Sequence, residues 1–225
     1  MPGHKLWCLA AIPTMTDEIY EEVMWSPWTD VGLEYLCMAG GQGGVTATGL
    51  VMRMPGLPWG FRYVVNLERR WLMRRIAFEP LDRPGWPLHL EEDGTWRTAH
   101  SNELRLLSGC LDVDLSVTPL TNTLILRRLD LAVGESAEVC VGYVTAPELR
   151  LERREQRYSR TGAMIYRLEE TRGDSEFEVD DAGLVLDWPG RYRRVWSLDK
   201  EERRLDLERQ VAQRERLLLE RERDA

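Results

Sequence analysis

The stretch Ser108–Leu131, SGCLDVDLSVTPLTNTLILRRLDL, decides the fold prediction. In its first half, apolar and polar side chains alternate strictly. The apolar positions are Leu111, Val113, Leu115 and Val117, and the polar positions between them are Asp112, Asp114 and Ser116. A period of two is typical of a half-buried strand. The polar run Thr118–Thr123 and a second apolar run, Leu124–Leu131, follow, so the whole stretch predicts a β-hairpin with a short polar turn.

The charged residues of this hairpin predict its register. If the residues that flank the turn close it, antiparallel pairing places Asp114 opposite Arg127, within reach of an ion pair. Arg128 then falls on the apolar face and is the cation available to a ligand. A slip of one residue exchanges the roles of the two arginines. We expect Asn122 to hold the turn through hydrogen bonds from its side chain to the backbone rather than through burial.

The hairpin sequence also resembles a known family. Gly109–Leu124, followed by Leu126–Leu129, is similar to the signature of the bacterial Putative glycolipid-binding family. The similarity extends from about Trp25 to Val195 and includes Gly32–Glu34, Tyr63 with Trp71, Gly142–Val144 and Val179–Gly190. The resemblance implies an open, strongly curved sheet like those of lipoprotein carriers. It also implies an apolar concave face that binds a glycolipid or another amphiphile.

The rest of the chain predicts further strands joined by turns. Alternation with a period of two recurs between residues 31 and 107 and again between 137 and 197, and Gly and Pro mark the turns. About a dozen short strands without intervening helices indicate an all-β fold with a largely antiparallel sheet. With the resemblance, we expect this sheet to be strongly curved or to form an open half-barrel.

The two ends of the chain depart from this pattern. Residues 1–23 contain an apolar run at the lower limit of signal-peptide length, followed by acidic residues. We expect them to form an extension that precedes the β domain, which spans residues 24–197. Residues 198–225 lack Gly and Pro and are rich in Glu, Arg and Leu, which predicts a charged helix. We expect this helix to be a solvated appendage, with self-association through it as the alternative.

Composition argues against several classes of partner. The chain has 225 residues and a net charge of -8, with a pI near 5.1, which argues against nucleic acid. No stretch approaches the ~20 apolar residues of a transmembrane helix. Cys8, Cys37, Cys110 and Cys140 form no Cys-x-x-Cys pair, so we expect reduced, mostly buried thiols in a cytoplasmic protein.

The sequence lacks the usual catalytic and metal-binding motifs. Its three histidines have no cysteine or carboxylate at metal-ligand spacing, so we expect no metal and no other cofactor. No Gly-x-Ser-x-Gly motif is present. On a strand, Asp112 and Asp114 would lie roughly 7 Å apart, as in inverting glycosidases, but no second acidic motif is available to face them. We therefore expect salt-bridged structural aspartates rather than an enzyme.

These observations predict a non-catalytic protein that binds a glycolipid-like amphiphile on the concave face of the sheet. The nine tryptophans can fill the core or line such a face. The candidate ligand-binding residues are Asp112, Asp114, Thr118, Thr121, Asn122, Arg127, Arg128, Trp71 and Tyr143. One alternative is a structural or protein-interaction module with a solid interior, and a weaker one is a hydrolase acting on carbohydrate or lipid.

Overall fold

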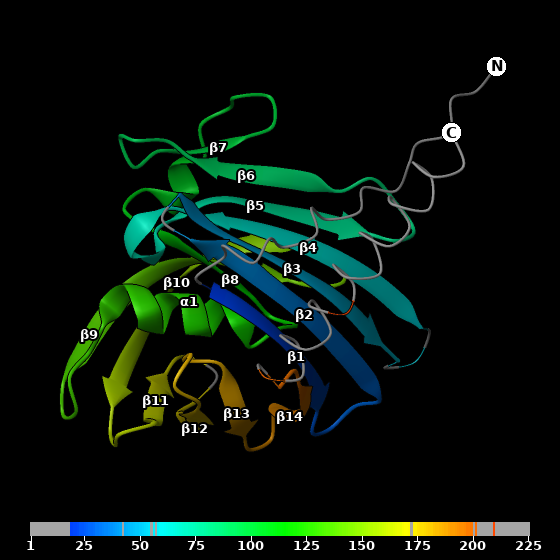
Figure 1. The fold of residues 1–225 in the computed structure, drawn as a ribbon. Coiled ribbons are helices and arrows are strands. Elements are labelled where there is room, and N and C mark those ends of the chain that lie inside the picture. The colour runs from blue at the N-terminus through cyan, green and yellow to red at the C-terminus, as the bar shows by residue number, and fades with distance from the viewer. Residues whose placement is uncertain are drawn as a thin grey trace, which may run out of the picture.

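The computed structural model describes residues 19–199, apart from 42, 55, 57 and 172, together with the single residues 201 and 209. The expected helix over 198–225 therefore lies almost entirely outside the described residues. The described part forms one sheet of 14 strands and one short α-helix (Figure 1), which confirms a mostly β, largely antiparallel fold. None of the helices in this part is long and apolar enough to cross a membrane.

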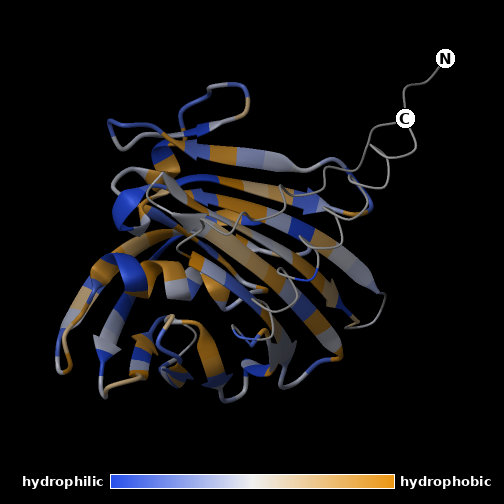
Figure 2. Cartoon of the chain, in the orientation of Figure 1, coloured by the Kyte–Doolittle hydropathy of each residue, from blue (hydrophilic) through white to orange (hydrophobic). Residues whose placement is uncertain are grey.

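The strands follow one another across the sheet in the order β7-β6-β5-β4-β3-β2-β1-β14-β13-β12-β11-β10-β9-β8. Their bounds are β1 Ile19–Pro27, β2 Gly32–Gly41, β3 Gly44–Arg53, β4 Trp59–Leu67, β5 Met73–Pro80, β6 Trp86–Leu90, β7 Trp96–Thr98, β8 Asp112–Leu115, β9 Ser136–Thr145, β10 Arg150–Arg160, β11 Ile165–Glu169, β12 Ser175–Val179, β13 Val185–Trp188 and β14 Tyr192–Ser197. Short 3₁₀ turns, η1 (Arg69–Trp71) and η2 (Arg105–Leu107), interrupt them. Burial alternates along strands such as β3 and β4, so each of these strands buries one set of side chains, and apolar and polar residues are mixed along the sheet (Figure 2).

The strong curvature that the resemblance implied is not found. The sheet is open, with β7 and β8 at its two edges, and it is neither closed nor strongly curled. Its inner face is filled by large side chains, among them Trp25, Tyr63 and Trp96, none of which is more than 1% exposed. Because interiors pack at nearly the density of organic crystals, side chains of this size leave no room for a tighter curl.

The predicted hairpin is wrong in its second half. Thr118–Leu131 does not form a turn and a strand; instead Leu120–Leu129 forms the helix α1, and β8 pairs with β9 in parallel. Parallel neighbours need a crossover connection, which α1 supplies. The residues that suggested a turn also begin helices: the Thr118 hydroxyl accepts the backbone N–H of Leu120 at 3.0 Å, and Pro119 caps the helix.

Helix α1 joins the two hydrophobic cores of the molecule. Leu120 and Leu124, four residues apart on one side of the helix, belong to the core formed mainly by β1–β8. Ile125 and Leu126 belong to the core formed mainly by β9–β13. The helix therefore covers β8, whose residues are buried on both faces rather than on one.

The N-terminal boundary of the β domain was predicted too late in the sequence. Strand β1 begins at Ile19, and Val23, which the sequence placed in an extension ending at residue 23, is 1% exposed. β1 pairs with β2 on one side and with β14 on the other, so it connects the two halves of the sheet. The acidic pair Glu21 and Glu22 obscured the period-two pattern in the sequence.

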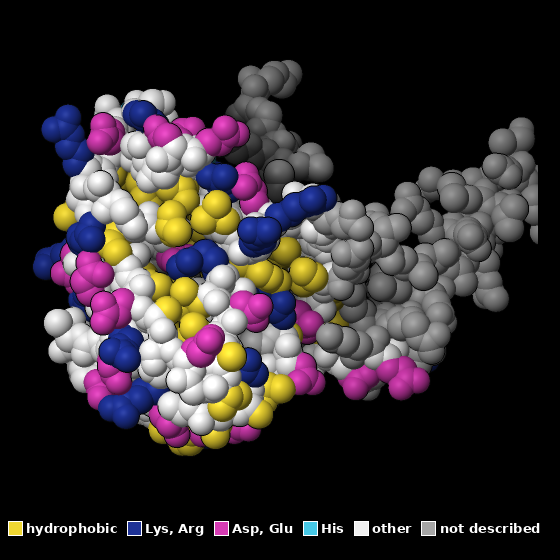
Figure 3. All heavy atoms as spheres, turned by 90° about the vertical axis from the view of Figure 1, so that its left-hand side faces the viewer, with side chains coloured by type: hydrophobic (Ala, Val, Ile, Leu, Met, Phe, Trp, Pro, Cys, Tyr) yellow, Lys and Arg dark blue, Asp and Glu magenta, His cyan; other side chains and the backbone are white. Residues whose placement is uncertain are grey.

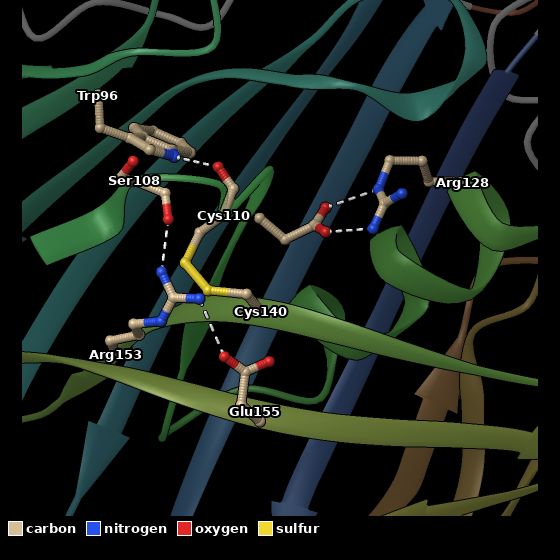
Figure 4. The surroundings of a disulfide bond; sticks show 8 residues. Trp96, Ser108, Cys110, Arg128, Cys140, Arg153 and Glu155 are labelled. Atoms are coloured by element: carbon tan, nitrogen blue, oxygen red, sulfur yellow. Dashed lines mark hydrogen bonds and ion pairs between the residues drawn. A yellow bond between two sulfur atoms is a disulfide. The ribbon is translucent and has the colours of Figure 1, made fainter. Parts of the chain in front are cut away.

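The expectation of reduced cysteines is wrong for one pair. Cys110 and Cys140 form a disulfide that ties the start of β8 to β9 (Figure 4). The two residues are 30 apart in sequence, and only the β8–β9 pairing, which sets Asp112 beside Val141, brings them together. Cys37 remains a thiol, and Cys8 lies outside the described residues. The expectation of a cytoplasmic location rested on reduced cysteines, so this disulfide removes the argument for it.

From the position of β1 we predict how truncation of the N-terminus changes the free energy of unfolding. Deleting residues 1–23 removes the part of β1 that pairs with Leu36–Gly40, together with the buried side chain of Val23, whereas deleting 1–18 removes no described contact. The longer deletion should lower the free energy of unfolding by about 2 kcal/mol or more relative to the shorter one. Urea unfolding of both variants measures this, and equal midpoints would contradict the assignment of Ile19–Val23 to the core sheet.

Candidate functional site

One cleft gathers three of the residues that the sequence singled out. It has a volume of about 610 Å³ and lies where η1, the end of α1, the β10–β11 loop and the β12–β13 turn meet. Its lining comprises Arg70, Arg127, Arg128 and Arg160, the carboxylates of Asp130, Asp180 and Asp181, the rings of Trp71 and Tyr166, and Leu126, Met164, Val179 and Gly183. We call it the Arg–Trp cleft. Rings, cations and carboxylates within one cavity suit a polar ligand that also has apolar surface.

The central feature of the cleft is the stack of Arg127 on Trp71. The guanidinium carbon of Arg127 lies 4.2 Å from the centre of the Trp71 ring, and its Nε donates to the carbonyl of Ala182 at 2.6 Å. Among the described residues, no carboxylate lies within ion-pair distance of Arg127. Burial lowers the pKa of its guanidinium, which nevertheless remains charged at neutral pH. Arg127 is therefore a fixed cation that makes no direct ion pair with a described carboxylate, although the charges of Glu21 and Asp180 act on it.

The backbone that carries Trp71 is strained. Arg70 and Trp71 have φ of 61° and 63°, in the left-handed region that bulky residues rarely adopt. Each such residue costs about 1–3 kcal/mol and persists only where its surroundings hold it in place. Strain of this kind often marks ligand sites, and here it is concentrated in one wall of the cleft.

Arg128 is the paired arginine of the two. Its Nε donates to Asp112 Oδ1 at 3.1 Å and its second nitrogen contacts Oδ2, so the pair is bidentate (Figure 4). The predicted Asp114–Arg127 pairing is therefore wrong, because it rested on the register of a hairpin that does not form. On a helix, adjacent arginines lie about 100° apart rather than on opposite faces, so both can line one cleft.

Asp114, Thr121 and Asn122 lie beneath the cleft, in a buried network. Thr121 donates to Asp114 Oδ1 at 2.8 Å, and Gln156 donates to Oδ2 at 2.7 Å. Asn122 accepts the hydroxyl of Tyr158 at 2.7 Å. Each of the three candidates is at most 4% exposed, so they support α1 rather than a ligand. The prediction that Asn122 holds a turn through hydrogen bonds to the backbone rather than through burial is wrong, because Asn122 is buried in α1 and bonds the Tyr158 side chain.

Thr118 takes part in a second buried network. Its hydroxyl donates to Glu34 Oε1 at 2.6 Å, and the Tyr63 hydroxyl donates to the same oxygen. Glu34 Oε2 has no hydrogen-bond partner, and the residue is completely buried. Burial raises the pKa of Glu34 from its usual 4.5 to about 7, although both hydrogen bonds act in the opposite direction.

Tyr143 lies away from the cleft. It is 4% exposed within the core of β9–β13, and the guanidinium of Arg154 stacks on its ring at 3.5 Å. The structure thus brings together only Trp71, Arg127 and Arg128 from the sequence candidates.

Sequence reasoning missed other residues of the cleft. Asp180, Asp181 and Gly183 come from the β12–β13 turn, and Arg160 comes from the end of β10. The motif Val179–Gly190 already contained the first three, as part of the family resemblance, but nothing in the sequence placed it beside α1. Within the described part of the chain, no group of three or more His, Cys, Asp or Glu could hold a metal ion.

From the Asp112–Arg128 ion pair we predict an energetic coupling that replaces the Asp114–Arg127 pairing expected from the hairpin. A double-mutant cycle of Asp112→Asn with Arg128→Gln should give a coupling energy of about 1.5–3 kcal/mol, because the pair is charged and largely buried. The matched cycle of Asp112→Asn with Arg127→Gln should give nearly zero. Urea unfolding measures both, and equal coupling would contradict the assignment.

From the raised pKa of Glu34 we predict how the free energy of unfolding depends on pH. Because its pKa is higher in the folded chain than in the unfolded chain, its stabilising effect is complete below pH 4.5 and is lost as the pH rises through about 7. The loss from this group amounts to at most about 3 kcal/mol. The variant Glu34→Gln should show a flatter decline of unfolding free energy between pH 5 and pH 8. Parallel profiles for the two proteins would exclude this role.

Comparison with known proteins agrees with the fold. Residues 22–194 match the model of the family described as Putative glycolipid-binding. A crystal structure of a DUF1089 family protein from Pseudomonas aeruginosa superposes with a TM-score of 0.64 and 29% sequence identity, covering 72% of this chain and 92% of that one. No curated protein matches the chain. Since the matched residues make up most of the sequence, the chain belongs to the Putative glycolipid-binding family.

Proposed function

We propose that the protein binds a glycolipid-like amphiphile without catalysing a reaction on it, and that the polar head group occupies the Arg–Trp cleft. The observation that carries this proposal is the Arg127–Trp71 stack, which fixes a charged donor group at a ring without a carboxylate partner. Membership of the family supports the class of ligand. The inner face of the sheet, expected as the site, is packed with side chains, so the ligand is assigned to a cleft at its edge.

The chemistry of the cleft suits a sugar. Sugar rings offer apolar C–H faces to an aromatic ring and hydroxyls to charged side chains. Trp71 supplies the ring, Arg127 supplies donors, and Asp181 lines the same cavity as an acceptor. Leu126 and Met164 extend the lining with apolar surface for the first carbons of an acyl chain. A volume of about 610 Å³ lies within the usual range for small-ligand pockets.

A binding role fits the two aspartates better than glycosidase chemistry does. Asp112 is engaged by Arg128, and Asp114 is engaged by Thr121 and Gln156. Burial raises the pKa of Asp114, and its side chain does not line the cleft. Neither carboxylate is therefore placed to act on a ligand held by Trp71, which supports a non-catalytic role.

Surface charge supports a small ligand over a polyanion. On the face shown in Figure 3, acidic and basic side chains are interspersed around a central group of apolar ones. Nucleic-acid-binding surfaces need basic side chains clustered on one face. Together with the net charge of -8, this pattern favours recognition within a cleft.

The proposal is tested by titrating the purified chain calorimetrically with octyl glucoside below its critical micelle concentration. Trp71→Ala and Arg127→Gln should each weaken binding about tenfold or more, since each removes a contact worth over 1 kcal/mol. The matched control is Arg193→Gln, because Arg193 also stacks on a tryptophan, Trp28, at 5.0 Å, but lies outside the cleft. Thermal unfolding confirms that each variant folds. No binding by the unmodified chain, or equal losses in all three variants, would overturn the assignment.

A further inference from the structure

A second cavity system lies at the other end of the sheet. The Arg–Trp cleft lies beside η1, which follows the last residue of β4, whereas these cavities lie around Trp59, the first residue of β4. One is an open groove of about 460 Å³, and the other is a polar cleft of about 450 Å³. Arg53 and Trp59 line both. We call the first the apolar groove; its side walls are Val31, Leu33, Met52, Met54, Trp59 and Leu81.

The apolar groove exposes an unusual amount of apolar side chain. Val31 is 69% exposed, Leu81 65% and Met52 58%. Leu33 pairs across the sheet with Met52, and Met52 pairs with Gly60, whose lack of a side chain leaves room for Leu81 to pack against the strand. A Cβ at Gly60 would lie 2.3 Å from the Leu81 side chain. Contiguous apolar surface of this kind on a soluble protein marks a binding site more often than chance.

Arg53 gives the groove a charged end. It is 6% exposed, one guanidinium nitrogen donates to the carbonyl of Val117 at 3.0 Å, and the group lies over the ring of Tyr192 at 5.7 Å. No carboxylate of a described residue lies within ion-pair distance of it. The buried Glu34 takes its hydrogen bonds from Tyr63 and Thr118 instead. The charge of Arg53 acts on the buried Glu34, but the two groups form no direct ion pair, so Arg53 can still take the carboxylate of a ligand as its direct partner.

We propose that the apolar groove binds one free long-chain fatty acid, with the carboxylate at Arg53 and the alkyl chain along Met52, Trp59 and Leu81. The geometry favours a single chain with a single charge, since one cation lines an otherwise apolar groove. A lipid bilayer would instead call for several basic residues around the rim, and Arg53 is the only basic residue among those that line the groove. This site is separate from the proposed glycolipid cleft and does not depend on it.

The test compares three probes of equal chain length on the full-length protein. Dodecanoate and dodecyltrimethylammonium are used below their critical micelle concentrations, and dodecanol is used below its solubility limit. Calorimetry should show one dodecanoate per chain, with the other two bound at least tenfold more weakly. Arg53→Gln should remove this preference. Because Arg53 is buried, replacing it is expected to lower stability as well, so Leu81→Asp provides a second test at an exposed position. It should weaken dodecanoate binding tenfold or more.

Controls separate this site from the glycolipid cleft. Val133→Asp places the same charge at a residue that is 60% exposed and outside the groove, and it should leave dodecanoate binding unchanged. Trp71→Ala should also leave it unchanged. Equal binding of dodecanoate and dodecyltrimethylammonium, or no effect of Leu81→Asp, would overturn the proposal. If Leu81→Asp instead abolished octyl glucoside binding while Trp71→Ala did not, the groove would be the glycolipid site and both assignments would fall.

Discussion

The structure depends on burying the polar first turns of α1. Thr118, Thr121 and Asn122 are almost fully buried, and a buried hydroxyl or amide without a partner costs about 1–3 kcal/mol. Their partners come from three different strands: Glu34 of β2, Asp114 of β8, and Tyr158 of β10. Because each bond requires its strand to be in place, the helix fixes the two halves of the sheet relative to each other.

This constraint also determines where a ligand can bind. The helix and the large aromatic side chains occupy the inner face, so the hollow expected of a lipid carrier is filled with protein. Cavities remain at the two ends of the strands, where turns and the end of α1 leave side chains unpacked. The last turn of α1 contributes two of the four arginines of the Arg–Trp cleft, Arg127 and Arg128, and the first turns are buried. One short helix thus stabilises the fold and supplies the candidate site.

Strands were predicted well from the sequence where buried and exposed residues alternate. The prediction failed where the same residues are compatible with either a turn and a strand or a helix. β3 and β4 follow their period-two pattern, and the turn between β2 and β3 lies at glycines, between Gly41 and Gly44. Thr118–Thr123, however, is equally favourable as a turn and as a helix start, and Leu124–Leu129 fits both periods. Of the residues that the sequence singled out, Trp71, Arg127 and Arg128 line one cleft, but their partners followed from a β8–α1–β9 crossover that no local pattern encodes.

Two arginines at opposite ends of the sheet are built in the same way. Arg127 lies over Trp71 and donates to the carbonyl of Ala182, and Arg53 lies over Tyr192 and donates to that of Val117. A ring and a carbonyl orient a guanidinium without neutralising its charge, whereas a carboxylate does both, as at Arg128. Since an oriented charge that no carboxylate contacts directly can still bind an anion or a polar head group, this distinction separates arginines suited to recognition from those that stabilise the fold.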